Sequence, residues 1–444
     1  RRNDIEHSAI FFNTKLIIFT DYEYSNLEAL LNSESLLNEE VISKLIKDEL
    51  FILMLKKSIV KDHLFERILT KLRSEILFNL FDSDKKILKE NYEFIISLAH
   101  QCFLNEYVFF ESDREIININ KLKNLIEKDN KIQELEIAIL SCYIPLYHSK
   151  VIENKVIKYN SENFLFNDLV TLQIKEPYNE KKLLNSIKSI GEISDNVSQQ
   201  VRGQYEKNPY PRWRYTNGSL PSNPLVIVNS QIKPNKIQFN DNFKKPNVLI
   251  AGCGTGKHIF IAENYLNSNI TAIDLSKASL AYAKRKIIES GINNVEFIHA
   301  DILALSKLNR KFDIIESVGV IHHMQNPLKG LNILLNLLEP HGILKLGLYS
   351  EIARNDIIEA REFIQKNRFG STIKDIRNVR QFIFNEKKNK LLKNISENGD
   401  FFSTSNVRDL IFHVQEHRFT LPQISKILLD FNLEFLGFID LELK

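Results

Sequence analysis

This chain of 444 residues has little of several features that define large protein classes. Its three cysteines, Cys102, Cys142 and Cys253, form no Cys-x-x-Cys pair, so neither a disulfide framework nor a structural zinc site is expected. No run of about eighteen apolar residues occurs, and we therefore expect no membrane span. The formal net charge of +3 is too small to indicate a nucleic-acid binder, although it does not exclude one.

The remaining composition is that of an ordinary globular protein, with 43% hydrophobic and 26% charged residues. The length suffices for two or three domains. Unpaired cysteines suit a reducing compartment, so we expect a cytoplasmic protein. The chain begins with Arg1-Arg2 rather than Met, which is not a signal peptide, and we expect this to be the cut end of a longer protein.

The most informative segment is a glycine-rich turn between a strand and a helix. The apolar run 248–251 predicts a buried strand, and the turn carries Gly252, Gly254 and Gly256 before a helix from about 257 to 267. This Gly-x-Gly-x-Gly spacing is one residue shorter than the dinucleotide fingerprint, so we do not expect the last glycine to play the same helix-packing role as in that fingerprint. The turn predicts close approach of a ligand to the backbone.

Further strands end in polar residues. The strand 270–273 ends at Asp274, about twenty residues beyond the glycines, where a carboxylate can accept two hydrogen bonds from a ribose diol. The next strand ends at Asp301, and the strand 312–318 contains Ser317. Because the carboxyl ends of parallel strands share one edge of a sheet, these residues predict a nucleoside-binding site.

In this order the motifs resemble the class I S-adenosylmethionine-dependent methyltransferases. The resemblance implies a Rossmann-like, doubly wound α/β sheet and S-adenosylmethionine as cofactor. It implies that the glycines pass under the methionine moiety, that Asp274 binds the ribose, that Asp301 and Ile302 hold the adenine, and that 317–320 form the floor near the methyl group. The cofactor-binding residues so implied are Gly252, Gly254, Gly256, Asp274, Leu275, Asp301, Ile302, Ser317 and Val318.

One departure from the family concerns the amino end of the cofactor. An acidic residue often stands two positions before the first glycine, where this chain has Ile250. We therefore expect the contact to the amino end to come from elsewhere, with the segment 200–215 as the candidate.

The domain organisation follows from the distribution of these motifs. We predict an all-helical N-terminal domain over 1–195, a Pro/aromatic linker and pocket cover over 196–245, and a methyltransferase domain over 246–444. A helical insertion over 355–412 follows the fifth strand. A strand is expected over 433–439, and the final strand of a class I sheet is expected to be missing.

The linker contains Asn-Pro-Tyr-Pro-Arg-Trp, which is stiff because each proline fixes its own φ and restricts its predecessor. A similar segment occurs in a bacterial branch of the family associated with tetratricopeptide repeats. It is either a rigid linker that fills a groove or a cover over the pocket. As a cover it would turn Tyr205, Tyr210, Arg212 or Trp213 toward the substrate or the cofactor carboxylate.

Two histidine motifs supply candidate bases. His322-His323 follows the fourth strand, where the alternative is a cap for the helix at Pro327, and His413-Val-Gln-Glu-His417 matches His-x-x-Glu-His. A metallopeptidase would need a third ligand and its own domain, so no metal site is expected; a polar helix end and a substrate pocket remain open. The candidates for catalysis are His322, His323, Glu351, His413 and His417, with Tyr349 at the tip of the fifth strand facing the substrate.

The sequence therefore predicts an enzyme that transfers the methyl group of S-adenosylmethionine to an unidentified nucleophile, an oxygen or nitrogen of a small molecule or a protein side chain. Three alternatives stay open: a tRNA-modifying methyltransferase, a cofactor-binding module without turnover, and a nucleotide-dependent oxidoreductase. The helical N-terminal domain is the candidate surface for a protein partner.

Overall fold

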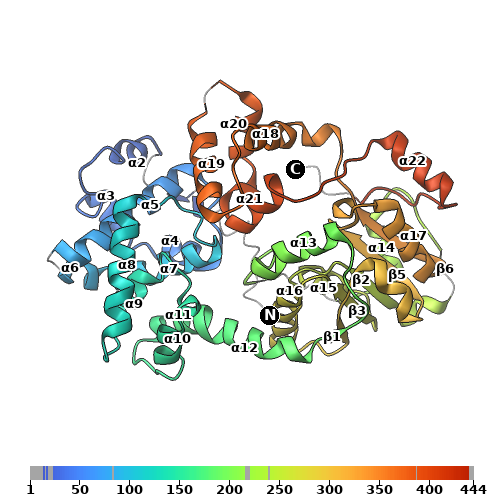
Figure 1. Cartoon of the computed structure of the whole chain (residues 1–444), viewed down its shortest axis with the longest axis horizontal. Coiled ribbons are helices and arrows are strands. Elements are labelled where there is room, and N and C mark those ends of the chain that lie inside the picture. The colour runs from blue at the N-terminus through green and yellow to red at the C-terminus, as the bar shows by residue number, and fades with distance from the viewer. Residues whose placement is uncertain are drawn as a thin grey trace.

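The computed structural model describes residues 14–15, 17–18, 24–82, 85–215, 221–238, 241–386 and 388–439. Figure 1 shows a helical N-terminal region beside an α/β domain, with a second group of helices next to both. Among the described residues, no helix is long and apolar enough to cross a membrane. The three cysteines are free and buried.

The N-terminal region is built from short helices around one apolar core, which includes the buried rings of Phe51, Phe65 and Phe94. Apolar residues recur at three-to-four spacing along these helices, so that each helix buries one face. The helices are α2 (Tyr24–Leu30), α3 (Glu40–Leu45), α4 (Glu49–Lys57), α5 (His63–Asp82), α6 (Lys85–Glu90), α7 (Tyr92–Leu104), α8 (Asp113–Lys128), α9 (Glu134–Leu140), α10 (Lys150–Val156), α11 (Phe164–Val170) and α12 (Glu176–Leu183).

The α/β domain contains a six-stranded sheet in the order β1-β4-β3-β2-β5-β6, and every neighbouring pair is parallel. The order reverses at β2, which carries the glycine turn at its carboxyl end. Such a reversal defines the ligand-binding edge of a doubly wound sheet. The strands are β1 (Lys188–Ser189), β2 (Asn247–Ala251), β3 (Asn269–Asp274), β4 (Val295–His299), β5 (Phe312–Val318) and β6 (Leu338–Gly347).

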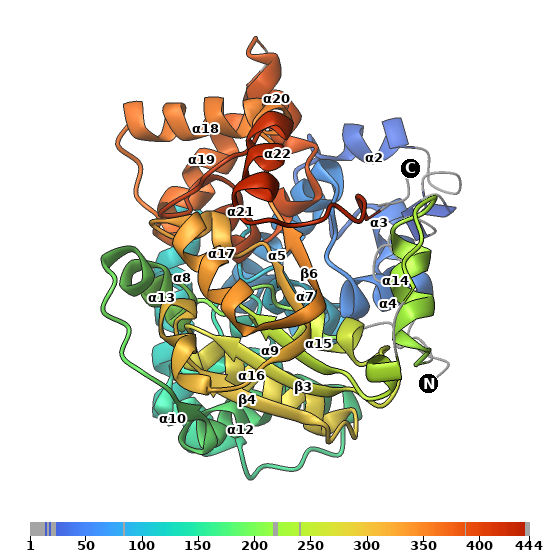
Figure 2. The same ribbon diagram turned by 90° about the vertical axis from the view of Figure 1, so that its right-hand side faces the viewer.

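Helices cover both faces of this sheet (Figure 2). Val248 and Ile250 of β2 pack on one face with α14 (Pro224–Gln231), α15 (Lys257–Ala262) and α16 (Lys277–Glu289). Leu249 and Ala251 pack on the other face with α17 (Pro327–Leu337), and α22 (Leu421–Asp430) adds Ile427 there. Successive residues of β2 are therefore buried on both faces of the sheet, without the alternation of buried and exposed residues seen in a strand with one exposed face.

The helices after β6 form a unit with its own apolar core. They are α18 (Asn355–Lys366), α19 (Ile373–Asn385), α20 (Lys390–Ser396) and α21 (Thr404–Ile411). Arg380 of α19 forms a buried ion pair with Glu66 of α5, at 2.6 Å, and so joins this unit to the N-terminal helices. Helices from the two ends of the chain therefore form one side of the protein, opposite the sheet.

Three details differ from the sequence prediction. The short strand β1 lies within the segment expected to be all-helical and adds an edge strand beside β4. The helix α15 ends at Ala262 rather than near 267. Residues 433–439 are not a strand; Leu436 instead packs beside the α14 core, and its carbonyl accepts a hydrogen bond from the Asn235 side chain. A strand needs a neighbour's backbone for its hydrogen bonds, and this segment contacts a helix end.

Candidate active site

The glycine turn after β2 is tied to the end of β3 by a carboxylate. Asp274 Oδ2 accepts the backbone N–H of Gly254 at 2.8 Å, and its Oδ1 accepts the N–H of Ser276 at 2.9 Å. Burial raises the pKa of Asp274 to about 6, although the backbone N–H groups of Ser276 and Gly254 oppose that shift. The side chain of Ser276, not that of Asp274, caps α16. Asp274 therefore fixes the turn from the side.

The glycines are required by close contacts. A Cβ at Gly252, where φ is +84°, would lie 2.4 Å from Val320 Cγ2, and one at Gly254 would lie 2.7 Å from the Tyr210 carbonyl oxygen. The backbone of the cover segment thus rests on the turn itself. Gly256 lies against a neighbouring helix, because a Cβ there would lie 2.7 Å from Ala283 Cβ in α16.

The other strand ends line the same edge. Asp301 is buried, and its Oδ1 accepts the N–H of Leu303 at 2.9 Å, with Ile302 buried beside it. Ser317 Oγ donates to the Ala251 carbonyl at 3.1 Å, next to Val318. The Leu275 carbonyl lies 3.0 Å from Nε2 of His299, a residue that sequence reasoning missed. Pairing of β3 with β4 and of β2 with β5 brings these ends together.

The cover segment, the described part of the predicted linker from α13 (Asn196–Lys207) to Tyr215, contacts the glycine turn. Trp213 Nε1 lies 3.2 Å from both the carbonyl and the hydroxyl oxygen of Thr255, and the ring is buried. Arg212 forms an ion pair with Glu106 of the N-terminal region at 3.0 Å. Trp213 thus contacts the glycine turn, and Arg212 contacts the N-terminal region.

The segment supplies one carboxylate that the motifs did not indicate. Glu206 accepts the backbone N–H groups of Lys277 and Ala278, at 2.8 and 3.1 Å, at the first turn of α16. A helix N-terminus favours such a negative charge. No local pattern marks Glu206 in the sequence, because its partner is a helix end about seventy residues away.

A buried polar cluster lies where the cover meets the helices after β6. The Tyr205 hydroxyl donates to Asp409 Oδ1 at 2.6 Å and lies 3.1 Å from His413 Nε2. The ring of Tyr210 stacks on that of Tyr205, with centroids 6.1 Å apart. Burial raises the pKa of Asp409 to about 6 and lowers that of His413 to about 2. Asp409 lies in α21, and sequence reasoning missed it because no motif surrounds it.

His322 and His323 complete this cluster from the carboxyl side of β5. Their Nε2 atoms lie 3.1 Å apart, and the ring of His323 stacks on that of His413 with centroids 3.6 Å apart. Tyr349, which follows β6, packs its ring against His322 at 3.9 Å. Burial lowers the pKa of both histidines, to about 3 for His322 and about 4 for His323. We call Tyr205, His322, His323, Tyr349, Asp409 and His413 the polar cluster.

Two of the predicted catalytic residues lie outside the polar cluster. Glu351 is half-exposed and pairs with Arg418 at 3.1 Å, while His417 Nε2 lies 3.1 Å from the amide of Gln415. The segment 413–417 is not helical, since α21 ends at Ile411. Glu416 of the His-x-x-Glu-His pattern is bound by Arg354. The spacing of a metallopeptidase helix is therefore absent from this segment.

A three-ligand group for a metal ion can nevertheless be drawn. Single ligand atoms of His323, Asp409 and His413 lie within 4.8 Å of one another. However, the two imidazole rings are stacked at an angle of 22°, and both Nδ1 atoms are directed at the carbonyl of Gln415. Ring nitrogens bind metals in the plane of the ring, and stacked rings do not direct their lone pairs at one point. The arrangement suits hydrogen bonding instead.

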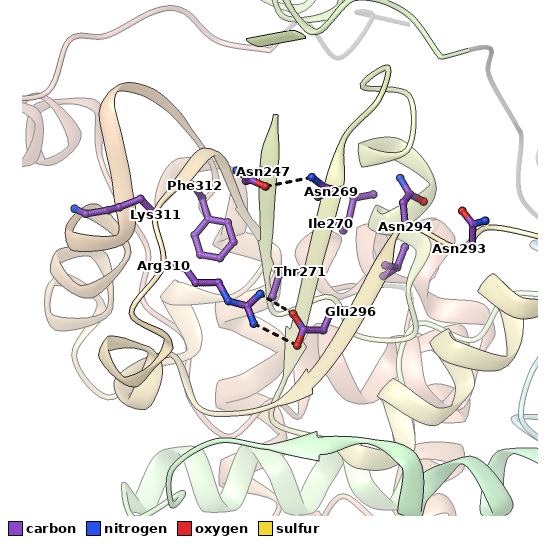
Figure 3. A pocket seen from close by; sticks show the side chains of 11 residues that line it. Asn247, Asn269, Ile270, Thr271, Asn293, Asn294, Glu296, Arg310, Lys311 and Phe312 are labelled. Carbon is purple, nitrogen blue, oxygen red and sulfur yellow. Dashed lines mark hydrogen bonds and ion pairs between the residues drawn. The ribbon is translucent and has the colours of Figure 1, made fainter. Parts of the chain in front are cut away.

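A hollow of about 470 Å³ lies at the opposite edge of the sheet (Figure 3). It is lined by the first residues of the strands, among them Asn247, Asn269 and Phe312, and an ion pair between Glu296 and Arg310 at 2.6 Å crosses it. Ligands of doubly wound sheets bind at the carboxyl ends of the strands, so this hollow is distinct from the candidate site.

The comparison with protein families agrees with this geometry. Residues 242–400 match the family model described as a methyltransferase domain. This segment contains the glycine turn, Asp274, Asp301 and the His322–His323 pair. The matched segment carries most of the doubly wound sheet, so the chain contains a domain that is similar to methyltransferase domains and has a Rossmann-like fold.

Relatives match parts of the chain. An uncharacterized protein of Synechococcus, syc1184_c, is 30% identical over 56% of this chain and 61% of its own length. The ubiquinone biosynthesis O-methyltransferase of Haemophilus ducreyi is 30% identical over 34% of this chain and 64% of its own. The structure of PKMT2 from Rickettsia typhi in complex with AdoHcy aligns with a TM-score of 0.41 at 22% identity, covering 50% of this chain and 46% of that one. The chain thus spans less than two thirds of the length of these relatives.

Proposed function

We propose that this protein transfers the methyl group of S-adenosylmethionine to a nucleophile held at the polar cluster. The observation that carries the proposal is the placement of two sites side by side. Asp274 and Asp301 lie at the ends of neighbouring strands beside the glycine turn, and the polar cluster begins two residues after Val320, whose side chain lies against that turn.

Under this proposal the cofactor lies along the strand ends, with Asp274 at the ribose and Asp301 and Ile302 at the adenine. The sulfonium methyl is already a strong electrophile, so the protein aligns a nucleophile with it and excludes water. The rings of Tyr205, Tyr210 and Tyr349 would contact the acceptor. The buried Asp409 and the histidines would orient the acceptor by hydrogen bonds and accept the proton that it loses. Glu351 and His417 have no place in this scheme.

The acceptor is an oxygen or a nitrogen of a small molecule or of a protein side chain. The resemblance of the cover segment to the bacterial tetratricopeptide-associated branch supports a protein partner for the N-terminal helices. A tRNA substrate and a cofactor-binding module without turnover are the competing functions.

Calorimetric titration of the intact chain with S-adenosylmethionine, S-adenosylhomocysteine and NAD tests the proposal first. We expect the first two ligands to bind and NAD not to bind. Incubation of the protein with methyl-labelled cofactor in extracts of its source cells, with and without ribonuclease, tests turnover. Label in protein or small molecules supports the proposal, label lost with ribonuclease assigns it to RNA, and cofactor binding without label favours the non-catalytic module.

A further inference from the structure

The His322–His323 pair has three polar contacts but, when both rings are neutral, only two hydrogens. His322 Nδ1 lies 3.2 Å from the Gly347 carbonyl, and His323 Nδ1 lies 2.6 Å from the Gln415 carbonyl. The two Nε2 atoms face each other at 3.1 Å. A carbonyl oxygen only accepts, and a neutral imidazole carries one N–H.

No arrangement of two hydrogens satisfies all three contacts. If both rings donate from Nδ1 to their carbonyls, two lone pairs face each other between the Nε2 atoms. If His322 donates from Nε2 to His323, its Nδ1 lone pair faces the oxygen of Gly347. One contact is repulsive in either case, whereas a third hydrogen makes all three contacts hydrogen bonds.

The rings cannot relieve this mismatch by turning to solvent. His322 is 0% exposed and His323 is 6% exposed. Tyr349 packs against one ring and His413 stacks on the other. Two backbone carbonyls and two aromatic neighbours thus hold a gap of the right size for one proton between the Nε2 atoms.

We propose that the pair is the general base of the methyl transfer proposed above, and that the proton removed from the acceptor is held between the two Nε2 atoms. The inference rests on that proposed function. In the step, the acceptor atom forms a bond to the methyl carbon, and the carbon–sulfur bond breaks with its electron pair left on sulfur. The proton of the acceptor passes to one Nε2 and is shared with the other, which balances atoms and charge.

Burial opposes the third hydrogen, because it lowers the pKa of both histidines, whereas the three hydrogen bonds that this hydrogen completes favour it. The charge of the cofactor makes this base responsive to the reaction. Before transfer, the sulfonium cation opposes a second positive charge on the pair. After transfer the sulfur is neutral, so the positive charge moves from sulfur to the pair and the charge of the pocket stays the same. The ionisable and charged groups that face the pair are Tyr349, Arg354, Arg361, Asp409, His413, Glu416 and His417.

Proton and nitrogen NMR of the protein labelled with ¹⁵N-histidine tests the inference without knowledge of the acceptor. The two probes are S-adenosylhomocysteine, whose sulfur is neutral, and sinefungin, which carries an amine in place of the sulfonium methyl. With the neutral ligand we expect, on lowering the pH, one far-downfield proton resonance coupled to two histidine nitrogens. With sinefungin the same resonance should appear at a pH lower by about one unit or more, because like charges repel.

His322→Gln and His323→Gln should each abolish the resonance, whereas His148→Gln, which changes an exposed histidine on the turn Leu146–His148, should leave it unchanged. The two-ligand comparison uses the unaltered protein and does not depend on folding of the buried variants. Two neutral rings at every pH with S-adenosylhomocysteine bound, or the same midpoint with both ligands, would overturn the inference. Failure of both ligands to bind would instead reject the methyl transfer on which it rests.

Discussion

The Asp274 carboxylate accepts the backbone N–H of Gly254 at 2.8 Å, so that the end of β3 holds the glycine turn that follows β2. The same carboxylate accepts the N–H of Ser276 at 2.9 Å. One side chain thus joins the glycine turn to Ser276, the N-cap residue of α16.

Asp274→Asn tests this relationship. An amide has one acceptor oxygen, so one of the two backbone N–H groups loses its partner and the ribose loses a charged acceptor. We expect the affinity for S-adenosylmethionine, measured by calorimetry, to fall at least about tenfold, or about 1.4 kcal/mol. Asp313→Asn is the matched control, because Asp313 accepts the N–H of Asn247 at the opposite edge of the sheet. Equal affinities for both variants would reject the cofactor site.

Gly254→Ala tests the contact between the turn and the cover segment. The new Cβ would lie 2.7 Å from the Tyr210 carbonyl oxygen, at a φ of +53° that costs about 1 kcal/mol for a residue with a side chain. We expect a lower melting temperature and weaker cofactor binding, since the cover must move.

Gly203→Ala is the control for that substitution. Gly203 lies inside α13, and nothing lies within 4 Å of the position that a Cβ would take there, so alanine should stabilise the fold by about 0.5–1 kcal/mol. The melting temperature should therefore rise for Gly203→Ala and fall for Gly254→Ala. A shift in the same direction would contradict the assigned contact.

Asp409→Asn tests the pH dependence of stability. Burial raises the pKa of Asp409 from 3.8 to about 6, so the folded state binds more protons than the unfolded state between these values. The free energy of unfolding should consequently fall as pH rises from about 4 to 6, by up to about 3 kcal/mol from this residue. Asparagine keeps an oxygen for the Tyr205 hydroxyl and removes the charge. In chemical denaturation, the free energy of unfolding of the variant should rise relative to that of the unaltered protein as the pH increases from about 4 to 6. Parallel plots of this free energy against pH for the two proteins would contradict the prediction.

Glu66→Gln tests the buried ion pair between α5 and α19. Arg380 is fully buried and would keep its charge without a charged partner, which costs about 3–5 kcal/mol. The double variant Glu66→Gln, Arg380→Met should recover part of this loss in urea denaturation. Glu40→Gln, which breaks an exposed pair with Lys44, should change nothing measurable. A Glu66→Gln protein as stable as the parent would show that the pair does not join the two units.

The sequence predicts the strand ends well because their signals are local. The runs before Gly252 and Asp274 form β2 and β3, and the order of the motifs indicates the shared edge. It does not predict Glu206 or Asp409, since each acquires its partner only through tertiary contact between distant segments. The expected strand at 433–439 fails for the same reason: a strand-like composition does not guarantee a neighbouring backbone.

The pair between Glu66 and Arg380 also has a consequence for how the protein is made. The two residues are separated by 314 positions, so the ribosome releases the N-terminal helices long before the arginine exists. Until then the carboxylate of Glu66 stays hydrated and the docking surface for α19 stays open. We therefore expect α21, which carries Asp409, to dock against the N-terminal helices only after α19 has been synthesised.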